Sequence, residues 1–279
     1  MRRISIAQDT VKILDIGSYI SPTGKEVNVG QSLRCCLGTT EHYEPEKLLE
    51  IQQKILGREP QYESTNFEVK NETSLTGAQR ISASQEFEKI CVLNFASAKN
   101  PGGGFLKGAQ AQEESLVRSS ALYKSLLLCP EYYEFHRRNG SRLYSDRMIY
   151  SPDCPVFKTD DGTLLEEPYL VDFITSPAPN AGAILRNKPT DLDKIPEVFY
   201  GRATKLLSLA AQYNCDALIL GAWGCGVFKN QPSLVARMFA DLLLVNGLFW
   251  GRFKKVIFSV LDSSKNKGTF MEFDKCFAV

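Results

Sequence analysis

Apolar residues change their spacing about 65 residues into the chain, where a mixed polar segment gives way to alternating strands and helices. ICVLNFA at 90–96, DALIL at 216–220 and KVIFSVL at 255–261 are near-continuous apolar runs, as expected for parallel strands covered on both faces. Segments 196–213 and 232–245 instead repeat apolar residues every three or four positions, which predicts helices. The alternation predicts an α/β domain with helices on both faces of its sheet.

Shorter elements fill the gaps between these segments. The pattern predicts a strand at 67–69, a helix from Thr73 to 84, a helix over 112–128, a hairpin turn at 160–162 (DDG) and a helix end at Asn246–Gly247. We therefore divide the chain into residues 63–279, a three-layer α/β/α domain with a mixed, mostly parallel sheet, and residues 1–62, an N-terminal helical extension.

The extension contains one clear amphipathic segment, EPEKLLEIQQKIL, which follows an earlier short helix and turn. It carries Leu48, Leu49, Ile51 and Ile55 on one side, and these apolar side chains need a surface to cover. We expect the extension to pack on the main domain and to close the far side of a ligand crevice.

Composition supports a globular protein in a reducing compartment. The 43% of hydrophobic residues can form an ample core, and no apolar run approaches the roughly 20 residues that span a bilayer. The two N-terminal arginines precede no apolar h-region, so we expect no signal peptide. The eight cysteines include no CxxC pair. We therefore expect a cytoplasmic monomer with reduced thiols and no membrane contact.

Charge and ligand types exclude other classes. The 33 basic and 32 acidic residues nearly cancel, whereas nucleic-acid binding normally needs a basic excess, so we expect no direct sequence-specific nucleic-acid partner. With only His42 and His136 and no clustered ligands, we expect neither a metal site nor a cofactor.

Two glycine-rich loops follow buried strands: NPGGGF at 100–105 and GAWGCGVF at 221–228. Ligands of open α/β sheets bind where such loops gather, at the carboxyl ends of the strands. Converging backbone N–H groups could hold a diphosphate between the two loops, although each loop alone could be a tight turn. Neither loop is a Walker A or GxGxxG motif, so ATP hydrolysis and nicotinamide chemistry are poorly supported.

Two carboxylates, Glu113 and Glu114, begin the helix after the first loop. Adjacent helical residues point about 100° apart, so the two acids cannot do the same job. Acids in a first turn often only complement the helix dipole. Beside an anion site, however, they suit a sugar, because one can hold hydroxyls while the other moves a proton at a glycosidic bond.

The stretch NPGGGFLKGAQAQEE resembles the GGG–QEE signature of poly(ADP-ribose) glycohydrolases, which are built on a macrodomain. Further blocks between about 65 and 262 resemble the smaller bacterial-type branch: LNFASAKNPGGGF, AQEESLVRSSALY, MIYSPDCPVF, ITSPAPNAG and GAWGCGVFKNQP. The resemblance implies metal-free hydrolysis of ribose–ribose bonds in poly(ADP-ribose), with ADP-ribose as product. Because we expect the N-terminal extension to close the far side of the crevice, we predict that cleavage occurs mainly at chain ends. It implies that Glu114 is the general acid/base and that Glu113 holds ribose hydroxyls.

The expected substrate-binding residues come from both loops and the helix start: Asn100, Gly102, Gly103, Gly104, Phe105, Gln112, Gly224, Cys225, Gly226, Val227 and Phe228. Phe228 could stack on adenine or belong to the core, and Cys225 could be a thiol nucleophile if a histidine lay beside it. Two other functions stay open at this point: a non-catalytic ADP-ribose reader, and a hydrolase that removes single ADP-ribose units from protein or DNA.

Overall fold

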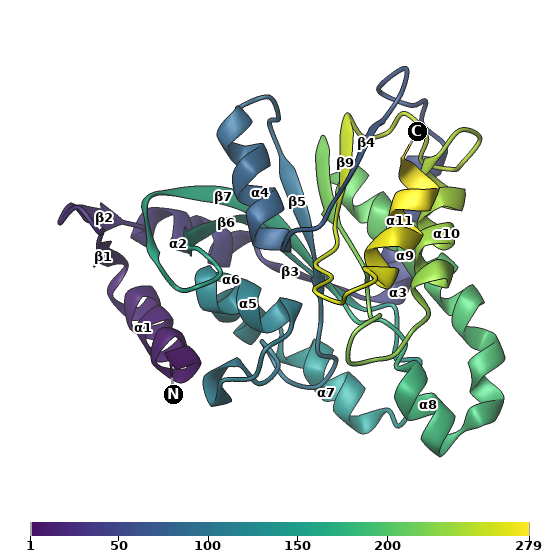
Figure 1. The fold of residues 1–279 in the computed structure, drawn as a ribbon, viewed down its shortest axis with the longest axis horizontal. Coiled ribbons are helices and arrows are strands. Elements are labelled where there is room, and N and C mark those ends of the chain that lie inside the picture. The colour runs from purple at the N-terminus through teal and green to yellow at the C-terminus, as the bar shows by residue number, and fades with distance from the viewer. Residues whose placement is uncertain (1, 279) are drawn as a thin grey trace.

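The computed structural model describes residues 2–278 and contains a seven-stranded sheet in the order β3-β6-β7-β5-β8-β9-β4 (Figure 1). The strands are β3 (Glu41–Tyr43), β4 (Asn66–Lys70), β5 (Ile90–Phe95), β6 (Met148–Lys158), β7 (Leu164–Ser176), β8 (Ala217–Leu220) and β9 (Lys255–Ser259). The β3–β6 and β6–β7 pairs are antiparallel and the other four pairs are parallel. The predicted mixed, mostly parallel sheet is confirmed.

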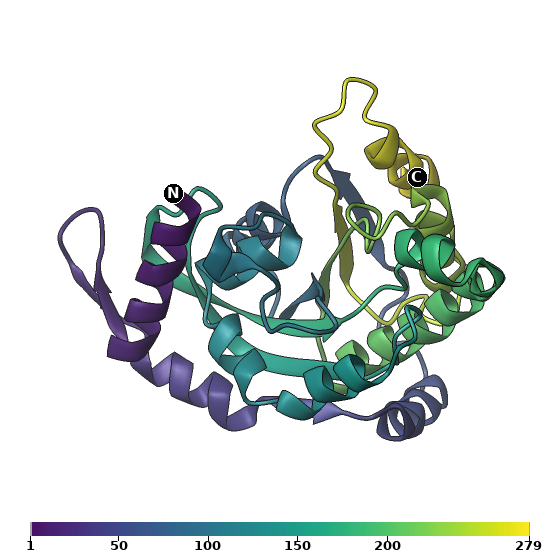
Figure 2. The same cartoon turned by 90° about the horizontal axis from the view of Figure 1, so that it is seen from below.

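Helices cover both faces of this sheet, as Figure 2 shows from below. They are α1 (Arg2–Ile16), α2 (Gly30–Thr39), α3 (Pro45–Leu56), α4 (Ser74–Ser84), α5 (Gln112–Ser119), α6 (Leu122–Leu127), α7 (Pro130–Arg138), α8 (Ala181–Asn187), α9 (Ile195–Gln212), α10 (Pro232–Leu243) and α11 (Gly268–Phe277). Short 3₁₀ turns η1 (Phe105–Lys107) and η2 (Pro189–Lys194) and a hairpin of β1 (Ser18–Ile20) and β2 (Glu26–Asn28) complete the chain. Buried side chains of α3, α9, α10 and α11 form one core, and those of α1, α2 and α4–α7 form the other.

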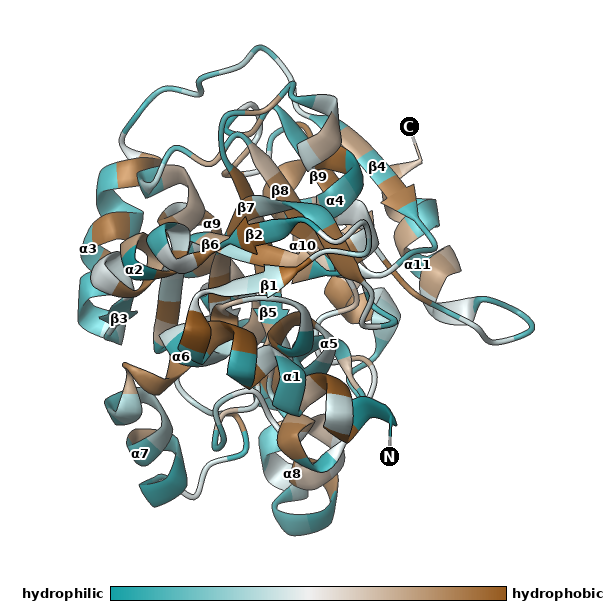
Figure 3. Cartoon of the chain, turned by 90° about the vertical axis from the view of Figure 1, so that its left-hand side faces the viewer, coloured by the Kyte–Doolittle hydropathy of each residue, from teal (hydrophilic) through white to brown (hydrophobic). Residues whose placement is uncertain are grey.

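Strand β5 explains why the central strands read as continuous apolar runs. Cys91 and Leu93 enter one core while Ile90 and Val92 enter the other, because successive strand residues point to opposite faces. Both faces of β5 are therefore buried, and in Figure 3 the strands around β8 and β9 are largely hydrophobic whereas the surrounding helices carry both hydrophilic and hydrophobic turns.

The N-terminal extension differs in part from expectation. Strand β3 joins the main sheet beside β6, so residues 1–62 are hydrogen-bonded into the domain as well as packed on it. Leu48, Ile51 and Ile55 are buried where α3 packs on α9, whereas Leu49 is 45% exposed. None of residues 2–62 borders the ligand cleft, so the expectation that the extension closes the far side of the crevice is wrong.

The predicted helix over 112–128 is broken at Ser120. The Ser120 backbone is extended and forms a β-bridge with Val156 of β6. The Ser120 hydroxyl donates to the Leu116 carbonyl at 2.7 Å. The next residue, Ala121, donates its N–H to the Pro155 carbonyl. Serine side chains compete with helical hydrogen bonds, and here a sheet edge supplies the alternative partners.

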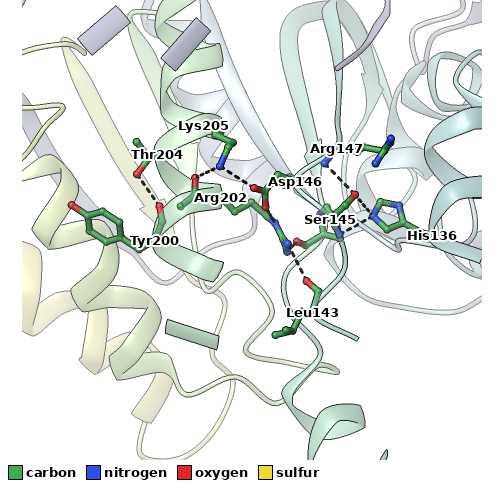
Figure 4. A network of polar contacts seen from close by, with 12 residues as sticks. His136, Leu143, Ser145, Asp146, Arg147, Tyr200, Arg202, Thr204 and Lys205 are labelled. Carbon is green, nitrogen blue, oxygen red and sulfur yellow. Dashed lines mark hydrogen bonds and ion pairs between the residues drawn. The ribbon is translucent and has the colours of Figure 1, made fainter. Parts of the chain in front are cut away.

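A buried polar network ties α9 to the loop before β6 (Figure 4). The Arg202 guanidinium, 1% exposed, donates to Asp146 Oδ1 at 2.9 Å and to the carbonyls of Leu143 and Pro177. Lys205 Nζ lies 2.9 Å from Asp146 Oδ2. Each of the three guanidinium nitrogens has an acceptor, so the network fixes the loop that leads into β6 and the Pro177 carbonyl that follows β7.

The parallel register brings strand ends together. Ile90 of β5 faces Ala217 of β8, Ala217 faces Lys255 of β9, and Lys255 faces Asn66 of β4. The carboxyl ends of these four strands therefore meet along one edge, where both glycine loops begin.

Candidate active site

A cleft of about 1160 Å³ opens at this edge of the sheet. Twelve of the thirteen predicted site residues line it: Asn100, Gly103, Gly104, Phe105, Gln112, Glu113, Glu114, Gly224, Cys225, Gly226, Val227 and Phe228. Gly102 does not, because it packs inward against the Phe105 ring and Val117. The structure therefore brings together two loops that lie about 120 residues apart in the chain.

The first glycine loop fits closely against the two acids. Gly102 and Gly103 have φ angles of 69° and 60°, the left-handed region that favours glycine. A Cβ on Gly103 would overlap Glu114 Oε1 and approach Glu113 Oε2 to 3.4 Å. Glycine at this position therefore lets the loop and both carboxylates occupy one wall of the cleft.

Phe105 lies below the first loop. Its ring is 1% exposed and packs on Tyr123 with ring centroids 4.6 Å apart. The predicted substrate contact can therefore come only from its backbone, while the ring supports the loop from within the core.

The second loop is shaped by close backbone approaches. Gly224, with φ 74°, leaves no room for a Cβ beside Ala178 and Asn230. The Asn230 amide donates to the Gly224 carbonyl at 3.0 Å and to the Pro179 carbonyl at 2.7 Å. At the tip of the loop Val227 is 75% exposed, which leaves an apolar surface free at the cleft mouth.

Glu113 points into the protein, toward the end of β5. Its Oε2 accepts the Ser97 N–H at 2.6 Å, and its Oε1 accepts from Asn94 Nδ2 at 3.3 Å. Burial raises the pKa of this carboxyl to about 8, against the opposing effect of these hydrogen bonds. Glu113 is therefore held in a fixed position, and burial favours its protonated form.

Glu114 instead faces the first loop and the cleft. Its Oε1 accepts the Gly104 N–H at 3.1 Å, and the side chain is only partly buried. As expected for adjacent helical residues, the two carboxylates point in different directions and have different surroundings. Both acids border the cleft, and Glu114 is the more exposed of the two.

Gln112 ties the start of α5 to β5. Its Oε1 accepts the Phe95 N–H at 2.9 Å, and its Nε2 donates to Ser74 Oγ at 3.1 Å and to the Leu93 carbonyl at 2.7 Å. Both amide hydrogens are used within the protein. The geometry therefore supports a positioning role for Gln112 rather than the predicted contact with substrate.

A Cys225 nucleophile has no base beside it. Burial raises the pKa of the thiol to about 12. His136 Nδ1 lies 2.8 Å from the Tyr132 carbonyl, and Nε2 accepts the Ser145 N–H; neither His136 nor His42 borders the cleft. Nucleophilic cysteines need a lowered pKa and a base, so the thiol mechanism is unsupported.

Glu113 gives a pH prediction. Its pKa rises from 4.5 unfolded to about 8 folded, so its contribution to stability is complete below pH 4.5 and is lost as pH rises through 8. From pH 5 to 8.5 the free energy of unfolding should therefore fall relative to Glu113→Gln by about 1 kcal/mol or more, since one pKa unit equals 1.36 kcal/mol. Urea unfolding across this range measures the difference.

His136 opposes this trend, because burial lowers its pKa to about 4. It is present in both proteins, so its contribution cancels in the difference. The substitution also places an N–H against the Asn94 or Ser97 donor, which adds an offset independent of pH. A difference that stays constant across the range would contradict the raised pKa of Glu113.

Several residues that border or support the cleft were not predicted. Asn94 is a fully buried amide within the apolar run ICVLNFA, and Ser97 supplies the backbone donor to Glu113. Arg118, on the apolar side of α5, donates to the Ala109 carbonyl at 2.8 Å and fixes the end of the first loop. A polar residue inside an apolar pattern was the available signal for Asn94 and Arg118.

Comparison with known proteins places this geometry in a family. Residues 7–159 match the model described as "Microbial-type PARG, catalytic domain". The poly(ADP-ribose) glycohydrolase of Thermomonospora curvata is 45% identical, with a TM-score of 0.94 over 99% of both chains. Its complex with the inhibitor ADP-HPD gives a TM-score of 0.91 over 98% of both chains at the same identity.

A second relative comes from another organism. The poly(ADP-ribose) glycohydrolase of Deinococcus radiodurans in complex with ADP-ribose is 40% identical, with a TM-score of 0.83 over 88% of this chain and 97% of that chain. A search of curated protein sequences gave no match.

Proposed function

The chain belongs to the microbial-type poly(ADP-ribose) glycohydrolases, and from that premise we propose which residues of its cleft carry out each part of the hydrolysis. The activity is that of a glycoside hydrolase that cleaves ribose–ribose O-glycosidic bonds. We assign the general acid/base role to Glu114. The observation that carries this assignment is the Gly104 N–H···Oε1 contact of 3.1 Å, which fixes an accessible carboxylate at the cleft wall.

Geometry rather than pKa decides between the two acids. Glu113 has the pKa expected of a proton donor at neutral pH, but its oxygens already accept from Ser97 and Asn94. A general acid must lie within hydrogen-bond reach of the atom that it protonates. Glu114 satisfies this condition from the cleft wall, and the neutral Glu113 carboxyl can still donate its proton to a ribose hydroxyl.

The hydrolysis then proceeds in two proton transfers. Glu114 donates a proton to the departing ribose oxygen while the C–O bond breaks and positive charge develops on the ribose retained in the cleft. The resulting carboxylate takes a proton from water, whose oxygen bonds to the same carbon. Glu114 thereby regains its proton, and ADP-ribose is the product.

Binding of ADP-ribose is proposed to use both glycine loops. The relative from Deinococcus radiodurans binds ADP-ribose. In this chain, Gly103–Gly104 and Gly224–Gly226 face one cleft whose volume is large enough for a nucleotide-sized ligand. Backbone N–H groups of the second loop would hold the diphosphate while the distal ribose lies over Glu113 and Glu114.

ADP-ribose should raise the melting temperature of the protein, because a ligand that binds only the native state stabilises it. AMP and ribose should each raise it much less at equal concentration, since neither can occupy the diphosphate site and the acid pair together. Thermal-shift measurements compare the three. Equal stabilisation by AMP and ADP-ribose would contradict the diphosphate site.

We propose that cleavage occurs mainly at chain ends. Support comes from the cleft end formed after β9 and β4, where Asp262 and Asn71 form two hydrogen bonds of 3.0 Å. Asp262 Oδ2 also accepts the Thr269 N–H at 2.8 Å, which braces the loop against α11. We expect a polymer bound through an internal unit to run into this wall, because its chain would have to continue beyond the cleft.

A time course on long poly(ADP-ribose) should therefore release monomeric ADP-ribose from the start. Internal cleavage would release short oligomers early, because each internal cut makes two chains. Separation of the products by length at low conversion measures the ratio. Early oligomers in excess of monomer would contradict chain-end cleavage.

A cytoplasmic location and a monomeric state are also proposed. Support for the first comes from the eight cysteines, which are free thiols in the structure. Support for the second is that one chain supplies every wall of the cleft. Among the helices of residues 2–278, none has the length and apolar character needed to cross a bilayer.

A further inference from the structure

A second hollow of about 470 Å³ lies beside the cleft, between the first turn of α1 and the loop before Glu113. Lys107, Gln110 and Asp160 border both the hollow and the cleft, so the two spaces are neighbours. Figure 1 shows α1 beside α5 and this loop, and a Cβ on Gly108 would lie 3.1 Å from Ile4 of α1. The N-terminal helix thus forms a wall next to the catalytic acids.

The hollow is basic. Four cations and two carboxylates line it: Arg2, Arg3, Lys107, Arg118, Asp160 and Asp161. The carboxylates are already bound by hydroxyls, since Asp160 accepts from Thr73 Oγ1 at 2.5 Å and Asp161 accepts from Thr159 Oγ1 at 2.6 Å. Within residues 2–278, the Arg3 and Lys107 side chains have no hydrogen-bond or ion-pair partner. Two cations are therefore left to meet an anion.

The hollow lies beside the loop that joins Gly104 to α5, the helix that carries Glu114. Glu114 is the proposed proton donor to the leaving oxygen, so the next polymer unit starts beside Glu114. Arg118 is close enough to Glu114 and to Arg3 for both charges to act on it. Burial lowers the pKa of Arg118, the Glu114 carboxylate raises it, and the Arg3 guanidinium lowers it further. A chain that leaves past Glu114 therefore meets the cationic hollow first.

We propose that this hollow binds the diphosphate of the ADP-ribose unit on the leaving side of the scissile bond. The proposal rests on the proposed function, because it takes Glu114 as the acid that protonates the leaving oxygen. A single ADP-ribose attached to an amino acid side chain has no phosphate at this position. The hollow would therefore favour polymer over mono-ADP-ribosylated protein.

The test uses a two-unit ADP-ribose oligomer and ADP-ribose as ligands of the full-length Glu114→Gln protein, in which cleavage is blocked. Adding Arg3→Gln and Lys107→Gln should weaken oligomer binding about threefold to tenfold at 0.1 M salt, as expected for two exposed charge contacts. ADP-ribose binding should change by less than about twofold, and the effect on the oligomer should shrink as salt rises. Calorimetric titration measures both dissociation constants.

Lys12→Gln is the matched control, because it removes one charge from the exposed side of the same helix. Lys12 lies nine residues from Arg3, about 13 Å along the axis, which exceeds the Debye length of about 10 Å at 0.1 M salt. It should leave oligomer affinity unchanged. Unchanged oligomer affinity in the Arg3/Lys107 variant, or an equal loss for both ligands, would overturn the proposal. Failure of the parent protein to release ADP-ribose from polymer would instead contradict the proposed function.

Discussion

Glu114→Gln should lower the turnover of poly(ADP-ribose) by at least about 10²–10⁴-fold, the usual contribution of a general acid or base. Glutamine keeps the size of the side chain and can still accept the Gly104 N–H, but it has no proton to transfer. Binding of ADP-ribose should stay within about tenfold, or 1.4 kcal/mol, because the loop contacts to the diphosphate remain. Release of ADP-ribose under saturating polymer measures turnover.

Glu113→Gln is the matched comparison, since it makes the same change one residue earlier. It should lower activity through loss of position, because its oxygens hold two protein donors rather than the leaving oxygen. Near-normal turnover of Glu114→Gln together with loss of activity in Cys225→Ala would restore the thiol mechanism. ADP-ribose binding without product release by the parent would identify a reader.

Gly103→Ala should reduce turnover by about 10²-fold or more, since a misplacement of about 1 Å at a catalytic group can cost that much. The added methyl group would overlap Glu114 Oε1, so the carboxylate must leave the Gly104 N–H. The φ of 60° adds backbone strain. Steady-state kinetics on polymer measures the loss.

Gly24→Ala is the control that separates the effect of backbone strain from the effect of displacing the Glu114 carboxylate. Gly24 has a φ of 88° in the β1–β2 hairpin, and an added Cβ would meet no atom within 4 Å. Its substitution should lower the melting temperature slightly and leave turnover unchanged. Equal turnover in the parent and Gly103→Ala would mean that Glu114 does not act from the position seen here.

The central sheet could be predicted because burial on both faces leaves a direct mark in the sequence. β5, β8 and β9 each carry an unbroken apolar run, and parallel strands place the following loops at one edge. The sequence therefore predicts that the two glycine loops face each other across one cleft.

Other elements left no such mark. β3 has three residues, EHY, and is a strand only because β6 offers it an edge. α2 contains two glycines and gains its order from packing on β6. In such short segments tertiary contacts outweigh local propensity, which explains why both were missed.

The sequence predicts which residue types form the site, but it does not predict the role of each residue. The 100° offset separated Glu113 from Glu114, yet only the fold shows that Ser97 and Asn94 hold the first. Likewise only the fold shows that the Phe105 ring supports the first loop from the core and that Gln112 ties α5 to β5. Such partners lie on other strands and helices, so spacing along the chain cannot identify them.

The pairing of β4 with β9 has a consequence for synthesis on the ribosome. These neighbouring strands, Asn66–Lys70 and Lys255–Ser259, lie near opposite ends of the chain, so the wall of the cleft cannot form until translation is nearly complete. At about 5–20 residues per second, roughly 10–40 s pass between the addition of Lys70 and that of Ser259. During that interval β4 lacks its partner strand, and an unpaired strand edge is a natural target for chaperones that hold nascent chains. A polypeptide released early by a stalled ribosome would lack the far wall of the cleft, so cells would not accumulate truncated chains able to degrade the polymer.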